Sequence, residues 1–350
     1  MAVATSKNAP EADSSEPQGM QQILQLSTAY MASACLYVAA KLRIADRLAD
    51  GPKPVSELAG RARGTHEESL YRVLRALASV GVFTEKAPRT FANTPTSELL
   101  RERVPGSMRD TVLFIADPTH FRVYAELEHS VKTGGTALKH LTGLETFEFL
   151  KKNPAEEAAF NAAMSNLSAQ HAHAVLEAYD FNGLGTIADI GGGHGALMTA
   201  ILKKHYGLRG IVFDAPHVVA GTAPHLESMG LGERCQALGG NFFEKVPAAD
   251  SYVLKSVIHD WDDAKAIAVL KNCATSMRAN AGKVLLLEMV LSPGNEPHFG
   301  KWVDLEMLVM AGGHERTEAQ FAELLSKAGL RLTRVVRTKS PVCVIESVRA

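Results

Sequence analysis

The stretch Thr186–Ala196, TIADIGGGHGA, decides the fold of this chain. Small and apolar residues leading to Ile190 predict a buried strand, and the run that begins at Ala196 predicts a helix. The glycines between them let the backbone take positive φ and approach a ligand closely. Gly191, Gly193 and Ala196 also satisfy the permissive G-x-G-x-x-G/A pattern of dinucleotide sites. On this stretch alone, a glycine-rich turn that binds nothing remains an alternative.

The composition is that of an ordinary globular protein with room for two domains. The chain has 350 residues, of which 46% are hydrophobic and 21% charged, and its net charge is -1. A near-neutral balance predicts neither nucleic acid nor an anionic membrane as partner. No apolar run is expected to span a membrane, and the first residues lack the basic-then-apolar order of a signal peptide. Four scattered cysteines indicate reduced thiols in a cytoplasmic protein rather than a zinc site.

The first part of the chain predicts a mostly helical module. We expect residues 1–18 to form a disordered tail and residues 19–106 a winged-helix-like dimerisation domain. Its first helix is apolar over several turns, which favours burial against another subunit. A helix over 65–80 and two short strands complete the outline. Arg72 and Arg75 keep DNA binding open, but nearby acidic residues and the absence of a basic run argue against it.

The remainder predicts a helical connector followed by an α/β domain. Residues 107–180 are helical in pattern and are expected to contribute to a substrate pocket. Residues 181–350 alternate strands with helices, which predicts a doubly wound, Rossmann-like sheet whose ligands bind at the carboxyl ends of its strands. The predicted strands are Ile187–Ile190, Ile211–Phe213, Gln236–Leu238, Tyr252–Leu254, Val284–Leu287, Leu332–Val336 and Val342–Glu346.

Polar candidates follow these strands. Asp214 ends the second, roughly twenty residues after the glycines, where a carboxylate can bind both ribose hydroxyls. Asn241 and Phe242 follow the third and could hold the edge and face of an adenine, although an ordinary turn is a serious rival. Lys255 ends the fourth strand. Together they predict a nucleotide-like cofactor.

His259 is the candidate general base, because a histidine beside the switch point is well placed to accept a proton. Glu288, at the end of the fifth strand, and Glu315, in a glycine-containing loop, could orient it and stabilise its cation. A structural histidine is the simpler reading in a chain with 13 of them. Asp262 and Asp263 could suggest a metal, but helix capping explains them more simply.

In these residues the chain resembles the plant- and bacterial-type S-adenosylmethionine-dependent O-methyltransferases that act on small aromatic hydroxyls. The most specific element is the His-Asp-Trp run at His259 in its context. The matching segments are DIGGGHG (Asp189–Gly195), FDAPHVV (Phe213–Val219), GGNFF (Gly239–Phe243), LKSVIHDWDD (Leu254–Asp263), LLLE (Leu285–Glu288), GGHERTEAQF (Gly312–Phe321), VGVF (Val80–Phe83), HSVKTG (His129–Gly134) and FNAAM (Phe160–Met164).

The resemblance implies a role for each candidate. The cofactor is S-adenosylmethionine, leaving as S-adenosylhomocysteine, and no metal is expected. Gly191 would lie at its amino-acid part, Asp214 at the ribose, and Asn241, Phe242 and Lys255 around the adenine, with Gly193 also binding the cofactor. His259 would deprotonate the acceptor hydroxyl, flanked by Glu288 and Glu315. The family also implies a homodimer in which each N-terminal domain lends a wall to the partner's pocket. Two residues depart from the usual pattern, Asn241 for Asp and His194 for Thr, Arg or Ser.

The acceptor and other reactions stay open at this point. Met164, Trp302, Met307 and Met310 are candidate pocket walls for a flat aromatic molecule, and equally ordinary core residues. N-methylation or a shifted reaction on the same cofactor is the alternative function. A nicotinamide dehydrogenase or a DNA-binding ligand sensor is further from the pattern.

Overall fold

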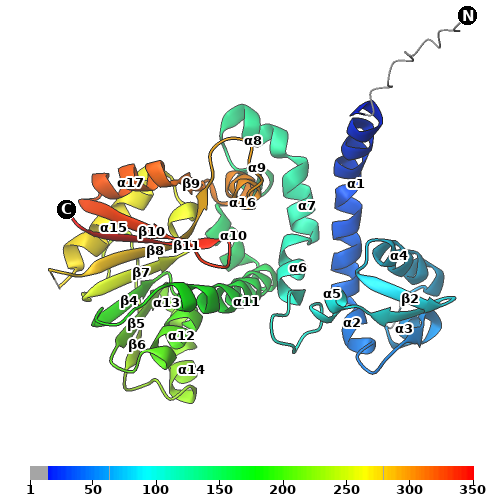
Figure 1. Ribbon diagram of the computed structural model, residues 1–350, viewed down its shortest axis with the longest axis horizontal. Coiled ribbons are helices and arrows are strands. Elements are labelled where there is room, and N and C mark those ends of the chain that lie inside the picture. Colours follow the sequence, from blue (N-terminus) through cyan, green and yellow to red (C-terminus); the bar gives the residue numbers. More distant parts are fainter. Residues whose placement is uncertain (1–14, 63, 279) are drawn as a thin grey trace, which may run out of the picture. The chain divides into compact units, whose positions relative to one another are not determined.

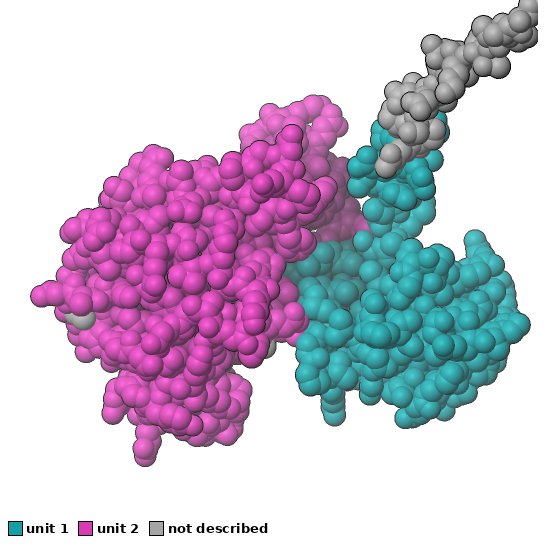
Figure 2. All heavy atoms as spheres, in the orientation of Figure 1, with its two compact units in different colours: residues 1–117 teal, residues 118–350 magenta. Residues whose placement is uncertain are grey.

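The computed structural model describes residues 15–62, 64–278 and 280–350 (Figure 1). It divides the chain into two compact units, Met1–Asp117 and Pro118–Ala350 (Figure 2). The division thus lies after the first helix of the segment that we predicted as a connector, α6 (Arg109–Ile115).

The first unit begins with the long helix α1 (Ser15–Lys41). The prediction of a tail to residue 18 was therefore wrong for residues 15–18, and residues 1–14 lie outside the described part. The segment Gly19–Lys41 is long and apolar enough to cross a membrane by length and composition alone, with mean hydropathy 1.4 and 11% burial. Our expectation that no run reaches that length was wrong. Its exposed apolar residues are Met20, Ile23, Leu24, Leu26, Tyr30, Met31 and Val38.

The rest of the first unit has the predicted helix-turn-helix and hairpin. Three strands pair in the order β1-β3-β2, with the hairpin formed by the second and third. Leucines on one face of α4, including Leu70, Leu74 and Leu77, are buried against the neighbouring helices. The elements are α2 (Ile44–Arg47), β1 (Lys53–Pro54), α3 (Val55–Arg61), α4 (Glu67–Ser79), β2 (Phe83–Ala87), β3 (Thr90–Asn93), α5 (Pro95–Glu98) and α6 (Arg109–Ile115).

The second unit opens with helices, as predicted for this segment. The last of them, α11, is the longest and packs on α12 beside the sheet. The helices are α7 (Pro118–Ala125), α8 (Leu127–Thr133), α9 (Ala137–Thr142), α10 (Thr146–Lys152) and α11 (Pro154–Ala178).

A mixed sheet forms the centre of the second unit, in the order β10-β11-β8-β7-β4-β5-β6, and β9 pairs with β8 (Figure 1). The pairs β4–β5, β5–β6, β4–β7 and β7–β8 are parallel, and β10 and β11 are antiparallel. Every strand predicted from the sequence for this sheet is present. The strands are β4 (Thr186–Ile190), β5 (Arg209–Asp214), β6 (Cys235–Gly239), β7 (Ser251–Lys255), β8 (Lys283–Leu291), β9 (Arg316–Thr317), β10 (Leu330–Val336) and β11 (Val342–Arg349).

Helices cover both faces of the sheet, because its parallel strands are apolar on both sides. Ala188 and Ile190 face one core, which α15 and α17 complete, whereas Ile187 faces the other, with residues of α11 and α12. Two helical features were not expected: α13 and α14 replace one predicted helix, and α16 continues into a π-helical turn, η2. The bounds are α12 (Ala196–Lys204), α13 (Pro216–Val219), α14 (Thr222–Ser228), η1 (Ile258–Asp260), α15 (Asp263–Ser276), α16 (Gly300–Glu306), η2 (Met307–Ala311) and α17 (Glu318–Lys327).

Candidate active site

The glycine turn joins β4 to α12 in a conformation that requires glycine. Gly191, Gly193 and Gly195 have φ of 70°, 55° and 80°, in the left-handed region. A Cβ on Gly191 would meet Val257 at 2.6 Å, whereas one on Gly193 would meet no described atom within 4 Å. Gly193 therefore borders open space at the carboxyl end of the sheet.

Asp214, at the end of β5, holds this turn in place. Its Oδ2 accepts a hydrogen bond from the Gly193 N–H at 2.8 Å, and its Oδ1 accepts one from the Ala215 N–H at 2.7 Å. Burial raises the pKa of Asp214, and the two backbone bonds oppose that effect. The predicted ribose ligand is thus adjacent to the predicted cofactor turn.

Lys255 comes to the same edge, because β4 lies between β5 and β7. Burial lowers the pKa of its ammonium, an effect that Glu288 and Asp189 oppose. Asn241 is exposed and folds back onto its own turn, donating to Glu244 at 3.0 Å and accepting from the Phe243 N–H at 3.1 Å.

Phe242 belongs to an aromatic cluster with Phe243 and Trp261. The Phe242 ring lies 6.1 Å from that of Trp261, and the Phe243 ring lies 4.8 Å from it, both edge to face. Phe147 packs on Trp261 at 5.5 Å. Trp261 therefore links the segment after β6 to the helical segment that precedes the sheet.

His259 lies in η1, just after β7, among three carboxylates. Its Nδ1 is 2.7 Å from Oε1 of Glu315 and 3.8 Å from Oε2 of Glu288, and its Nε2 is 3.6 Å from Asp260. The imidazole is 13% exposed, and both glutamate side chains are fully buried. The structure thus brings together the three residues that the sequence nominated.

The surrounding charges control the protonation of this site. Burial by itself lowers the pKa of His259, but Glu288, Asp260 and Glu315 together outweigh it and raise that pKa to about 10. Burial raises the pKa of Glu288, and it raises that of Asp260 to about 6. The surrounding carboxylates therefore favour the protonated form of His259.

Glu288 also shapes the backbone that carries His259. Its Oε1 accepts from the N–H groups of Val257 and Ile258, at 3.0 and 2.9 Å. Ser256, directly before them, has φ of 52°, a strained value for a residue with a Cβ. One carboxylate thus stabilises the sharp turn from β7 into η1.

Two of the methionines predicted as pocket walls, Met307 and Met310, lie in η2, which is in contact with η1. Met307 and Met310 are buried in η2, and Met164 is half-buried on α11. Trp302 differs, because its side chain is 65% exposed. The structure therefore does not bring it into a buried wall with the methionines.

Several buried polar atoms at this edge have no hydrogen-bond partner among the residues that the structure describes: Oδ2 of Asp189, Oε2 of Glu288, Oε2 of Glu315, Nδ1 of His171 and Nε1 of Trp261. Buried polar groups are normally paired, so these atoms are candidates for contact with a polar ligand. Burial and Lys255 lower the pKa of His171 to about 4, which keeps this imidazole neutral. A cationic cofactor with amino, carboxylate and ribose groups fits these atoms and the open space at Gly193.

Ligand atoms of His259, Glu288 and Glu315 lie within 4.8 Å of one another, a spacing that metal sites also show. Their hydrogen bonds favour another reading. The short bond to Glu315 occupies Nδ1, and two backbone N–H groups occupy Oε1 of Glu288. His259 and Glu315 are thus joined by a hydrogen bond, and Glu288 is bonded to the backbone beside them.

Two residues of the site, Asp304 and Arg316, were not predicted from the sequence. Asp304, on α16, accepts the Glu315 N–H at 2.7 Å. Arg316 is 1% exposed and bonds the backbone on both sides of His259. The feature of the sequence that could have indicated Arg316 is its position next to Glu315, in the matching segment Gly312–Phe321.

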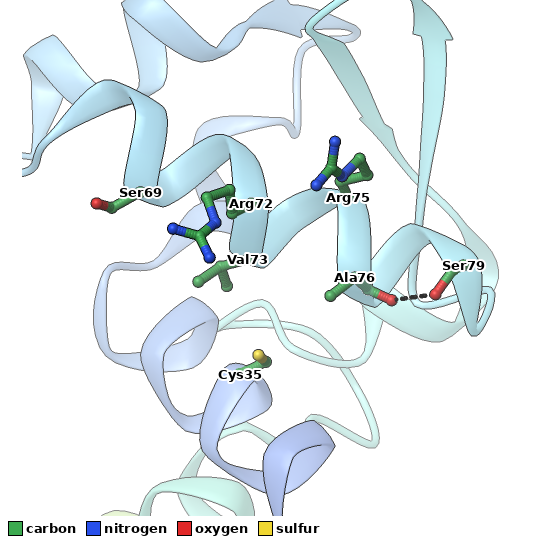
Figure 3. Close-up of a pocket in the computed structure, with 7 residues that line it drawn as sticks. All are labelled: Cys35, Ser69, Arg72, Val73, Arg75, Ala76 and Ser79. Atoms are coloured by element: carbon green, nitrogen blue, oxygen red, sulfur yellow. Dashed lines mark hydrogen bonds between the residues drawn. The ribbon is translucent and has the colours of Figure 1, made fainter.

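A separate pocket of about 560 Å³ lies in the first unit, between α1 and α4 (Figure 3). Arg72 and Arg75 line it, and Cys35 contributes from the facing helix. It holds none of the predicted cofactor residues. The remaining lining residues are Ser69, Val73, Ala76 and Ser79.

Comparison with known proteins identifies both parts of the chain. Residues 124–331 match the model of an O-methyltransferase domain, and residues 24–103 match that of an O-methyltransferase dimerisation domain. The phenazine O-methyltransferase PhzM of Lysobacter antibioticus is 45% identical over 93% of this chain and 95% of its own length. An 8-amino-8-demethylriboflavin N,N-dimethyltransferase of Streptomyces davaonensis is 34% identical over 95% and 96%.

Solved structures of similar proteins support the same family. LaPhzM superposes with a TM-score of 0.89 at 44% identity, covering 95% of this chain and 99% of its own. The neocarzinostatin O-methyltransferase NcsB1, solved with S-adenosylmethionine and 2-hydroxy-5-methyl naphthoic acid, has a TM-score of 0.78 at 34% identity, covering 92% and 96%. The expected family is confirmed: this chain belongs to the S-adenosylmethionine-dependent O-methyltransferases with an N-terminal dimerisation domain.

Proposed function

We propose that this enzyme methylates a hydroxyl of a small aromatic molecule with His259 as the general base. The observation that carries the proposal is the 2.7 Å hydrogen bond between Nδ1 of His259 and Glu315. It fixes the tautomer and the ring orientation, and it leaves Nε2 to receive a proton. A carboxylate that orients an imidazole and stabilises its cation is the usual partner of a catalytic base.

His259 must lose a proton before it can accept one. Because the surrounding carboxylates raise the pKa of His259, we expect the positive charge of the bound cofactor to lower that pKa and to favour the neutral base. The carboxylates of Glu288 and Asp260 then compensate that charge. The imidazole accepts the hydroxyl proton at Nε2 as the oxygen attacks, and Glu315 stabilises the resulting imidazolium.

Bound S-adenosylmethionine supplies an electrophilic methyl group on a cationic sulfur. In this proposal Gly191 and Gly193 receive its amino-acid part, Asp214 the ribose, and Phe242 and Lys255 the adenine. Asn241 contributes less, since its amide is bonded within its own turn. No metal takes part, because alignment and exclusion of water are sufficient for transfer from a sulfonium.

The acceptor class rests on the relatives and on the buried walls near η2. Relatives act on phenazine and naphthoate compounds, as their names state, and another is named as an O-methyltransferase of mitomycin biosynthesis. Met307, Met310 and Met164 offer adaptable apolar surfaces to such flat rings. Trp302 is exposed in the chain, so it would contribute only if a partner subunit covers it.

We further propose a cytoplasmic homodimer that uses neither nucleic acid nor a membrane. The apolar stripe of α1 supports a subunit contact, since exposed apolar patches of this kind mark interfaces. The four cysteines are free thiols, which fits a reducing compartment.

N-methylation is the second candidate, because a riboflavin N,N-dimethyltransferase is 34% identical over nearly the whole chain. An aromatic amine needs a base less than a phenol does, since a neutral amine nitrogen is a better nucleophile than a neutral phenol oxygen and can lose its proton after the attack. The two functions therefore differ in their dependence on His259.

Labelled S-adenosylmethionine with paired panels of phenols and aromatic amines tests the proposal. We expect O-methylation, and a His259→Ala variant should lose roughly 10²- to 10⁴-fold in turnover, the usual contribution of a general base. Cofactor affinity, measured by calorimetry, serves as the control for folding. Full turnover in the variant would contradict the role of His259, and amine products alone would favour the alternative.

A further inference from the structure

Arg316 is the largest fully buried side chain among the described residues. Taking a guanidinium out of water costs several kcal/mol unless its N–H groups find partners. Here they do. Nη1 donates to the Ile258 carbonyl at 3.1 Å, Nη2 donates to the Trp261 carbonyl at 2.9 Å, and Nε and Nη2 donate to Oδ1 of Asp263 at 3.1 and 2.8 Å.

The Ile258 and Trp261 carbonyls lie on either side of His259 in the sequence. Ile258 directly precedes His259, and Trp261 follows it by two positions, so one planar guanidinium holds the backbone on both sides of the imidazole. Arg316 itself directly follows Glu315. The same side chain therefore joins the segment that carries the histidine to the segment that carries its carboxylate.

An independent observation shows how tightly the two segments are packed. A Cβ on Gly313 would lie 2.0 Å from the His259 carbonyl oxygen and 2.5 Å from the Trp261 nitrogen. The backbones therefore touch directly. On its other side, Glu315 is fixed by the bond from its N–H to Asp304.

We propose that Arg316 is a positioning residue that sets the distance between His259 and Glu315. It acts through hydrogen bonds to the backbone and to Asp263. The inference rests on the proposed role of His259 as base. A lysine cannot replace it, because an ammonium lacks the planar fork that bonds carbonyls on two sides at once.

The test compares Arg316→Lys with Arg234→Lys in the full-length enzyme. Arg234 is a matched control, since it also donates to several backbone carbonyls, those of Leu202, Tyr206 and Leu208 among them, far in sequence from His259. We measure kcat, KM for S-adenosylmethionine, and the titration of His259 by nitrogen NMR of histidine-labelled protein.

For Arg316→Lys we expect kcat to fall about tenfold to hundredfold, as a displacement near 1 Å can cause. KM for the cofactor should stay within about twofold. The pKa of His259 should fall by about one to two units as the charge-assisted bond to Glu315 lengthens. Arg234→Lys should lower the thermal midpoint while leaving the His259 titration unchanged.

A second variant covers the case in which Arg316→Lys does not fold. The Asp263 side chain is 57% exposed, so Asp263→Asn weakens one anchor of the guanidinium at little risk to the core. It should shift the His259 titration in the same direction by less. An unchanged titration in both variants would overturn the inference, as would equal effects of Arg316→Lys and Arg234→Lys. The titration needs no turnover, so it stays informative even if His259→Ala proves active.

Discussion

Gly193 and Gly313, both in the second unit, have opposite structural roles. At Gly193 the missing side chain leaves open space at the edge of the sheet, with φ in the left-handed region. At Gly313 the missing side chain lets two backbones touch, since a Cβ there would meet the His259 carbonyl at 2.0 Å. The first glycine borders open space, and the second allows direct contact between two backbone segments. The structural role of a glycine in a motif therefore depends on the residues that pack around it.

The largest expected effect is the pH dependence of turnover, which involves the segment at Gly313 and not the segment at Gly193. If His259, beside the junction at Gly313, is the general base, turnover should rise about tenfold per pH unit below its pKa and then level off. That pKa is about 10 in the free protein, and a bound cation should lower it by repelling the imidazolium. Stopped-time assays at saturating cofactor between pH 6 and 10 measure the profile.

His259→Gln is the control for that profile, because it keeps the size of the side chain and removes the titration. Its residual activity should lose the tenfold slope. A flat profile in the unaltered enzyme would show that chemistry at His259 does not limit turnover.

Gly313→Ala breaks the junction. Overpacking commonly costs about 1–3 kcal/mol, and here backbone rather than a flexible side chain must move. We expect a lower thermal midpoint and a loss of kcat of about tenfold to hundredfold, because His259 and Glu315 are pushed apart. Cofactor affinity measured by calorimetry should change little. The neighbouring Gly312→Ala is a useful comparison, since its Cβ meets only a Thr136 methyl at 3.3 Å but its φ of 79° is left-handed.

Gly193→Ala tests the open segment and should have the smallest effect. No described atom obstructs the new methyl group, so the cost is the left-handed strain of about 1–2 kcal/mol. If the strain falls on the bound conformation, KM for the cofactor rises about fivefold to thirtyfold while kcat at saturation is retained. Gly207→Ala, at a position with equally open space and no positive φ, should leave both constants unchanged.

Most of the fold followed from the sequence because its signals are local. The strands β4 to β8 are short apolar runs, and parallel pairing brings their carboxyl ends together, so Asp214, Lys255 and His259 could be placed at one edge. The segments β9 and η2 were missed. β9 is a two-residue strand, and nothing local distinguishes a π-helical turn from an ordinary helix.

The candidate site was only partly predictable, because its remaining parts depend on long-range contacts. The ion pair between Arg316 and Asp263 joins residues 53 positions apart. The exposure of Trp302 and the protonation of His259 depend on burial, which spacing does not encode. The roles assigned to His259, Glu288, Glu315 and the cofactor residues remain predictions.

The unpartnered atoms at the edge of the sheet have a consequence for the lifetime of the protein in a cell. Asp189 is a fully buried carboxylate whose pKa burial raises to about 7, and we expect cofactor bound at this edge to add to the stability of the fold. Anything that binds only the folded state stabilises it by mass action, by about 2.7 kcal/mol at a hundredfold excess over its Kd. When cofactor becomes scarce, more molecules should open and meet proteases. The amount of enzyme would then follow the supply of the methyl donor without any dedicated regulator.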